Sequence, residues 1–146
     1  MRGPTYPQAV VCGLARILPA DTTGKKTVAT GKAAGAAEPG GTKITGLIAT
    51  SNDGTLAHVL LISILRTAVN YVIGAVNVPI NSGTDGTAVS VNLLNSTSIP
   101  GLPVDRNGQR YLLLQAGDVL QVNAAVAVSA NKEVDLVAMG YDFSDD

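Results

Sequence analysis

The sequence has few aromatic residues: no tryptophan, one phenylalanine and four tyrosines among 146 residues. A hydrophobic core must therefore be built from valine, leucine, isoleucine and alanine, and each large aliphatic side chain contributes about 1.5–3 kcal/mol on burial. Carbohydrate-binding platforms usually present exposed tryptophan or tyrosine rings. The tyrosines at positions 6, 71, 111 and 141 are too scattered to suggest such a platform.

Histidine and cysteine are almost absent as well. Cys12 is the only cysteine, so no disulfide can form within the chain. His58 is the only histidine, which excludes a multi-histidine metal site and leaves no second imidazole for a proton relay. We expect His58 to be a half-exposed strand residue. A serine–histidine–aspartate triad could in principle be assembled around it, but the sequence has no Gly-x-Ser-x-Gly elbow. We therefore expect neither an enzyme nor a cofactor.

Charge is also sparse and balanced. The chain has 10 lysines and arginines against 11 aspartates and glutamates, a formal net charge of −1. This composition lacks the basic excess that neutralises phosphates in a nucleic-acid complex. The longest largely apolar stretch, Val59–Leu65, is followed by Arg66 and is far shorter than the roughly 20 residues of a membrane-spanning helix. We expect neither nucleic acid nor membrane as a partner.

What the sequence has in abundance is short β-branched and aliphatic runs bounded by turn residues. Alternation of this kind, with a period of two, is typical of strands in a sandwich or barrel. The predicted strands cover residues 9–18, 26–30, 42–50, 58–66, 71–78, 110–115, 118–128 and 132–143, with a further short apolar piece at 89–94. About eight antiparallel strands predict an all-β fold, a β-sandwich of jelly-roll type.

The length of 146 residues is typical of one domain. Residues 1–41 are rich in proline, glycine, alanine and threonine, and we interpret them as an extended N-terminal arm, early strands and an Ala-Gly loop of that same domain. Residues 42–146 carry nearly all of the alternation and are predicted to form the sandwich core.

A long excursion separates two of the predicted strands, at residues 80–109. Long loops of compact domains often carry function. Within it, Asp105-Arg106-Asn107-Gly108 resembles the start of a calcium loop but lacks the remaining ligands and the closing glutamate. We interpret this segment as a turn, and likewise Asn52-Asp53-Gly54 and Thr84-Asp85-Gly86.

The order of several short segments resembles that of small structural proteins of tailed bacteriophages, encoded beside the major capsid protein. The resemblance spans about residues 17–143 and rests on segments 71–79, 83–86, 91–94, 99–105, 108–112 and 117–120. It implies a capsid decoration, or cement, protein: a β-sandwich that assembles, commonly as a homotrimer, on the outside of an expanded icosahedral shell. The implied partners are the major capsid protein and further copies of the chain. The implied location is the virion exterior, after synthesis in the bacterial cytoplasm.

Candidate contact residues follow from this hypothesis. Arms and long loops can reach neighbouring molecules, so the candidates for contact with the shell are Arg2, Tyr6, Gln8, Asp85 and Arg106. The candidates for contact between copies are Leu112, Leu114, Val126 and Val128, whose ordinary interpretation is core. Two alternatives remain open, another virion component such as a neck, tail or fibre protein, and a ligand-binding sandwich of cupin or lectin type.

Overall fold

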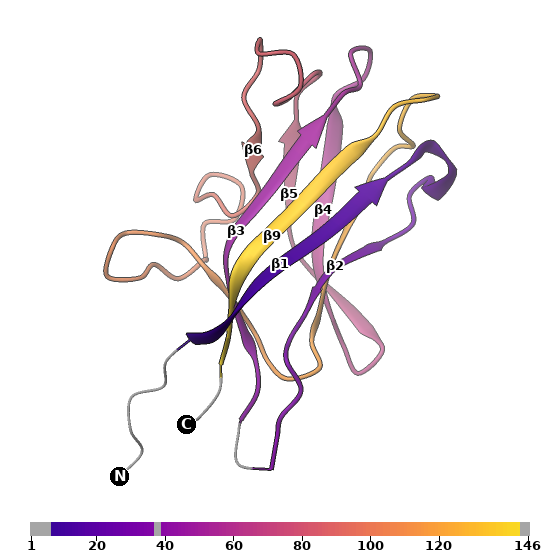
Figure 1. The fold of residues 1–146 in the computed structure, drawn as a ribbon. Coiled ribbons are helices and arrows are strands. Elements are labelled where there is room, and N and C mark those ends of the chain that lie inside the picture. Colours follow the sequence, from indigo (N-terminus) through magenta and orange to yellow (C-terminus); the bar gives the residue numbers. More distant parts are fainter. Residues whose placement is uncertain (1–6, 37–38, 144–146) are drawn as a thin grey trace.

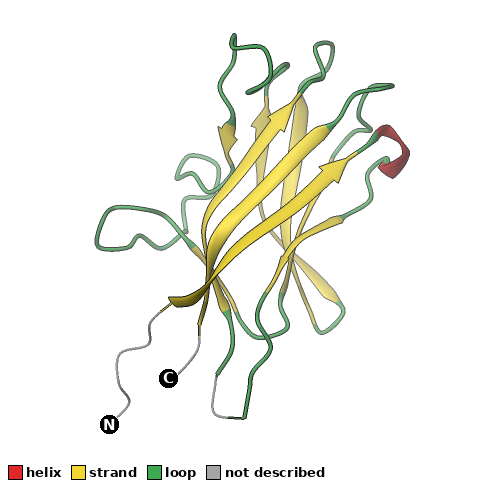
Figure 2. Cartoon of the chain, viewed as in Figure 1, coloured by secondary structure: helices red, strands yellow, loops and turns green. Residues whose placement is uncertain are grey.

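The computed structural model of the chain describes residues 7–36 and 39–143 (Figure 1). Almost all regular structure in these residues is β-strand, and one short 3-10 turn joins the first two strands (Figure 2). The elements are β1 (Pro7–Ile17), η1 (Pro19–Asp21), β2 (Lys26–Thr30), β3 (Thr42–Ser51), β4 (His58–Arg66), β5 (Val69–Val78), β6 (Val91–Asn92), β7 (Leu112–Leu114), β8 (Val119–Ala124) and β9 (Val134–Phe143).

The strands form two antiparallel sheets packed face to face. Sheet A has the order β1-β9-β3-β6, with β7 also paired to β3, and sheet B has the order β2-β8-β4-β5. Strands from the two ends of the chain lie side by side, because β9 separates β1 from β3 and β8 separates β2 from β4. This is the double Greek-key order of a jelly roll, and the predicted all-β sandwich is confirmed.

The strand boundaries predicted from alternation agree with the structure to within two residues except near residue 124. The predicted strand 118–128 ends as β8 at Ala124, because the chain there leaves sheet B and crosses to sheet A. The turn between β4 and β5 is also tighter than expected. It consists of Thr67 and Ala68, with φ angles of 50° and 61°, the left-handed pair found in type I′ hairpins.

The core lies between the sheets and is aliphatic, as the composition requires. Alternate residues of β4 and β8 point inward and are fully buried, for example Leu60, Ile62 and Val122. The excursion between β5 and β7 also contributes to the core through Leu93, Leu94, Ile99 and Leu102. This segment therefore closes one side of the sandwich and is not only a surface loop.

The N-terminal region contributes one strand to each sheet. β1 pairs with β9 from Ala9 to Ile17, and β2 pairs with β8, so both are edge strands of the sandwich. The part of the predicted arm before residue 7 lies outside the described residues.

Candidate functional site

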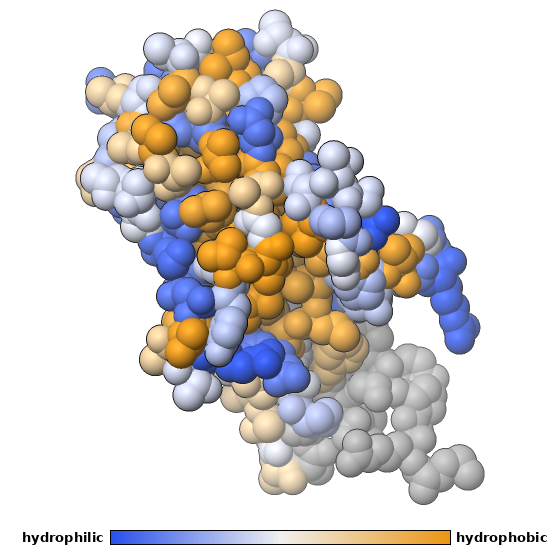
Figure 3. All heavy atoms as spheres, turned by 180° about the vertical axis from the view of Figure 1, so that it is seen from behind, coloured by the Kyte–Doolittle hydropathy of each residue, from blue (hydrophilic) through white to orange (hydrophobic). Residues whose placement is uncertain are grey.

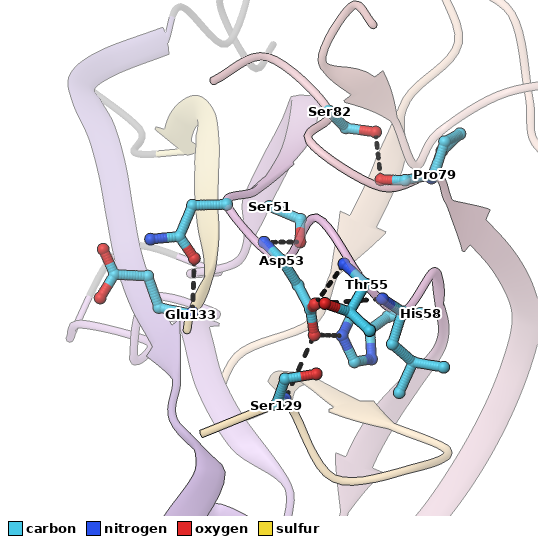
Figure 4. A network of polar contacts seen from close by, with 10 residues as sticks. Ser51, Asp53, Thr55, His58, Pro79, Ser82, Ser129 and Glu133 are labelled. Atoms are coloured by element: carbon cyan, nitrogen blue, oxygen red, sulfur yellow. Dashed lines mark hydrogen bonds and ion pairs between the residues drawn. The ribbon is translucent and has the colours of Figure 1, made fainter. Parts of the chain in front are cut away.

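The most connected polar cluster is the buried pair Asp53–His58 at one end of the sandwich (Figure 4). Asp53 lies in the turn between β3 and β4, and His58 is the first residue of β4. The Asp53 side chain accepts hydrogen bonds from the amides of Thr55 and Leu56 at 3.0 Å, from His58 Nε2 at 2.9 Å and from the Ser129 amide at 3.2 Å. One carboxylate thereby fixes the turn and ties it to the loop before β9.

The electrostatics of Asp53 follow from these bonds. Burial opposes ionisation and is the strongest single influence. The hydrogen bonds from Ser129, His58, Thr55 and Leu56 together outweigh it and hold the pKa of Asp53 well below its ordinary value. Asp53 is therefore an ionised carboxylate at neutral pH.

The same cluster extends to neighbouring loops. The Asn81 amide donates to the Asp53 carbonyl at 3.0 Å, and the Glu133 amide donates to Asn52 Oδ1 at 2.8 Å. Ser51 Oγ accepts from the Asp53 amide at 3.1 Å. The three segments that meet at this end, after β3, after β5 and before β9, are thus joined into one polar clamp.

The Asp53–His58 pair does not have the geometry of a hydrolytic triad. The prediction of a half-exposed His58 is wrong: the imidazole is 1% exposed, because the residue begins β4 on the side that faces the core. Within the described residues, His58 Nδ1 has no hydrogen-bond partner, so no serine hydroxyl is placed for activation. The role that this geometry supports is structural.

A second carboxylate is buried at the other end of β4. Asp118 accepts two hydrogen bonds of 2.6 Å from the Arg66 guanidinium and one of 2.8 Å from the Gln115 amide. The bonds from Arg66 hold the pKa of Asp118 below its ordinary value, against the opposing effect of burial. This pair ties the β4–β5 hairpin to the turn before β8.

The predicted turns use their aspartates locally. Asp85 Oδ1 accepts from the amide and hydroxyl of Thr87, and Asp105 Oδ1 accepts from the amides of Asn107 and Gln109. Both are Asx-type turns, as interpreted from the sequence. Among the residues that the structure describes, no group of three or more His, Cys, Asp or Glu side chains could hold a metal ion.

The predicted shell contacts do not form one described cluster. Arg2 and Tyr6 lie outside the described residues, and Gln8 belongs to β1. Asp85 and Arg106 are exposed on separate turns of the excursion. These assignments stay predictions.

The predicted contacts between copies require a correction. Leu112, Leu114 and Val128 are at most 8% exposed and belong to the core, which is the alternative interpretation that the sequence allowed. They point inward because β7 pairs with β3 and the loop after β8 turns back over the core. Only Val126, at 60% exposure, remains accessible to another copy.

Sheet A carries an apolar outer surface that the sequence analysis did not identify. We call it the β1–β9 face, and its outward residues pair across the two strands as Val10 with Tyr141, Cys12 with Met139 and Leu14 with Val137. Val10 is 82% exposed and Leu14 is 70% exposed. The face ends at an ion pair, in which Arg16 Nε lies 2.7 Å from Asp135 Oδ1. A signal was present in the sequence, because residues 9–15 are apolar at both parities, whereas a strand buried on one side alternates.

The outer surface of sheet B is uncharged at its centre. Seen from behind, hydrophobic side chains gather over the middle of the molecule (Figure 3). β4 presents Val59, Leu61 and Leu65 on this side, and β5 adds Val72, which is 58% exposed. Both sheets therefore offer flat apolar surface beyond the completed core. In the part of the chain that the structure describes, no helix has the length and apolar character needed to cross a membrane.

Comparison with known proteins gives a limited result. No family model matches the sequence, and the search of curated proteins finds no significant match. Two crystal structures of a pentameric capsid protein isolated from metagenomic phage sequences are similar to this chain. One is 18% identical with a TM-score of 0.39 and the other 14% identical with a TM-score of 0.40, and each match covers 92% of this chain. This chain spans 61% and 63% of their lengths, less than two thirds of either.

Proposed function

We propose that this chain is a structural protein of a tailed-bacteriophage particle. More specifically, we propose a decoration protein without enzymatic activity that binds the major capsid protein on the outside of the expanded shell as a homotrimer. The resemblance of residues 17–143 to that family supports the proposal. The jelly-roll order is compatible with it but is shared with lectins and cupins, so the fold alone does not assign a function.

The observation that carries the proposal is the β1–β9 face. Val10 and Leu14 are among the most exposed large hydrophobic residues, and Met139 and Tyr141 beside them are 40% and 41% exposed. Their burial against another protein would contribute about 25 cal/mol for each Å² of apolar surface removed from water. Contiguous apolar surface of this kind marks interaction sites in soluble proteins.

The shape of the face favours a protein partner over a small molecule. Small ligands bind in concave pockets that enclose most of their surface, whereas the hollow on the β1–β9 face beside Leu14, Arg16 and Val137 is shallow and open to solvent. The interior of the sandwich is occupied by its own aliphatic side chains. This favours a virion component over a ligand-binding sandwich.

Binding to a shell would stabilise it in a defined way. A protein that binds only the expanded lattice shifts the equilibrium toward that lattice by mass action. A trimer that contacts several shell subunits also raises the effective concentration of each further contact.

Lysine substitutions on the face test the proposal. Val10→Lys and Leu14→Lys place a charge in the proposed contact. Both variants are expected to lose co-sedimentation with expanded shells assembled from the major capsid protein of the same particle. Both side chains are exposed, so the thermal midpoint of unfolding is expected to stay within a few degrees of the parent. The matched control is Val59→Lys, because Val59 is 42% exposed but lies on the outer surface of sheet B, away from the β1–β9 face and outside the excursion. Unchanged binding by both face variants would show that the face is not the contact.

Copy number then separates the two virion roles. Quantitative mass spectrometry of purified particles is expected to give a ratio to the shell protein near one, or a simple fraction such as one third. A handful of copies per particle would replace decoration with a neck, tail or vertex role. Absence from particles would refute the virion assignment itself.

A further inference from the structure

Besides the β1–β9 face, the described residues leave a second surface without a partner. It is the free edge of sheet B, formed by β5. This strand has ten residues, none of them charged, and among the described strands it pairs only with β4. Within residues 7–36 and 39–143, no backbone hydrogen bond from another segment reaches its outer edge. Natural edge strands are usually short, charged or covered. Three other edge strands follow that rule, since β6 has two residues, β7 has three and β2 begins with Lys26, whereas the longer β1 contains only Arg16 as a charged residue.

β5 contains one extra residue at its centre. Ile62 of β4 pairs with Gly74 and the next residue, Ser63, pairs with Val72, so Ile73 is a bulge. The bulge shifts the alternation of the strand by one position. The outward side chains are therefore Asn70 and Val72 before it and Ala75 and Asn77 after it, and all four are exposed.

This pattern determines where the twofold axis of a pairing between two copies must lie. Consider two copies of β5 running antiparallel about an axis between Ile73 and Gly74. Asn70 of one copy then lies opposite Asn77 of the other, and Val72 lies opposite Ala75. Outward side chains face outward side chains at both of these pairs. In a strand without the extra residue, an axis between two residues would set outward positions against inward ones, which antiparallel pairing does not allow.

We propose that two copies of this chain associate through β5, in that register, and join their B sheets into one continuous sheet. At Gly74 the excursion packs on the inward side of the strand, and among the described residues no backbone hydrogen bond joins it to β5. A Cβ at Gly74, whose partner Ile62 is in the core, would lie 2.6 Å from Ile99 Cγ1.

The charges favour a second copy over a charged partner. No charged side chain lies in β5, and Arg66 beside it is neutralised by the two 2.6 Å bonds to Asp118. With a net charge of −1, two copies approach without strong repulsion. A single strand edge is a narrow interface, at the low end of protein–protein contacts. We therefore expect a dimer that dissociates on dilution.

The proposal goes beyond the function proposed above and does not depend on it. Both partners are copies of this chain, so the contact does not require a shell and can be measured on the purified protein in solution. An icosahedral shell has twofold axes, where a contact of this symmetry would join neighbouring decoration units.

Engineered cysteines test the register directly. In a Cys12→Ser background, Asn70→Cys and Asn77→Cys are combined in one chain. Opposed residues in antiparallel strands have Cα atoms about 4.5–5.5 Å apart, within the roughly 4.4–6.8 Å range of disulfides. Within one chain the two positions are about 23 Å apart along the strand, too far to bridge.

The expected result is a covalent dimer on mild oxidation of the double variant, and also of an equal mixture of the two single variants. Each single variant by itself is the control, because its cysteine would face asparagine. We expect several-fold less dimer from either single variant. Equal crosslinking of the single variants, or no dimer from the double variant, would overturn the register.

Light scattering on the chain with its native Cys12, under reducing conditions, tests the contact without engineered cysteines. The apparent mass of the parent is expected to rise toward twice the monomer mass as the concentration increases. The Val72→Lys variant is expected to keep the monomer mass at every concentration. Val89→Lys is the control, because Val89 is 84% exposed and lies outside β5, and it should behave as the parent. A parent chain that stays monomeric, or forms an oligomer insensitive to Val72→Lys, would refute the contact while leaving shell binding untouched. Loss of shell binding in the Val10→Lys variant with dimerisation intact would separate the two proposals.

Discussion

Replacing Asp53 is the perturbation whose effect can be worked out most fully from the structure. Asp53→Ala removes the acceptor of four hydrogen bonds and leaves the imidazole N–H of the fully buried His58 without a partner. Each buried donor left without a partner costs about 1–3 kcal/mol, so we expect a loss of about 3–5 kcal/mol for the set. For a domain of this size, each kcal/mol lowers the thermal midpoint by about 2–4 °C. The expected loss is therefore roughly 6–20 °C.

Urea denaturation followed by circular dichroism is the assay. Asp53→Ala is expected to lower the urea concentration at which half of the protein is unfolded, without changing how steeply the unfolding free energy depends on urea. Asp53→Asn is expected to have an intermediate stability, because the amide keeps one acceptor oxygen. The matched control is Asp85→Asn, since Asp85 is exposed and asparagine can make the same Asx turn. The control should change stability by no more than about 0.5 kcal/mol. A loss below about 1 kcal/mol for Asp53→Ala would refute the view that this carboxylate holds the loops together.

The pH dependence gives an independent check of the same reasoning. The pKa of Asp53 is lowered in the folded state from an ordinary value of 3.8, so its contribution to stability is fully present above that value. The contribution is lost as the pH falls through the lowered folded pKa. The difference in unfolding free energy between the parent and Asp53→Asn is therefore expected to be constant from pH 7 to about pH 5 and to shrink below pH 4. A difference that stayed constant down to pH 2 would contradict the assignment of an ionised carboxylate.

Three further outcomes are expected from the fold. Thr67→Asn combined with Ala68→Gly should stabilise the protein by about 1–2 kcal/mol in urea melts, because the left-handed φ angles of 50° and 61° strain residues with a Cβ; no gain would mean that the turn is unstrained. Gly74→Ala should destabilise the protein by about 1–3 kcal/mol, because the new Cβ would lie 2.6 Å from Ile99 Cγ1 in the core. Unchanged stability would show that the excursion can move away from β5. Leu114→Ala should lower the free energy of unfolding by about 2–5 kcal/mol, whereas Leu113→Ala, whose side chain is 50% exposed, should lower it far less. Equal losses would contradict the orientation of β7, in which Leu114 points inward and Leu113 outward.

Local pattern was sufficient for the strands and for several turns. The alternation of β4 and of β9 is visible in the sequence, and the Asn-Asp-Gly and Asp-x-Asn-Gly segments form turns in the structure as expected. Two-residue periodicity is a property of neighbouring residues, so it survives without knowledge of the rest of the chain. The same reasoning predicted a strand that continues past the end of β8 at Ala124, because that end is set by where the chain crosses to the other sheet.

The candidate surfaces were less accessible to sequence reasoning. Leu112 and Val10 are both apolar strand residues, yet one is 8% exposed and the other 82%. Pairing decides between them, because Leu112 lies on the inward side of β7 and Val10 on the outward side of an edge strand. His58 was misplaced for the same reason, since its burial depends on loops that approach from residues 81 and 129.

By itself the sequence determined an aliphatic, all-β domain of short antiparallel strands with no multi-histidine metal site and no internal disulfide, because composition and period-two alternation are local properties. The tertiary structure alone decided which face of each strand is covered, which carboxylates are buried and which edges stay open. Those features depend on contacts between residues far apart in the chain, such as β1 with β9 and Asp53 with Ser129, and alternation gives no information on which distant segment will return to cover a face.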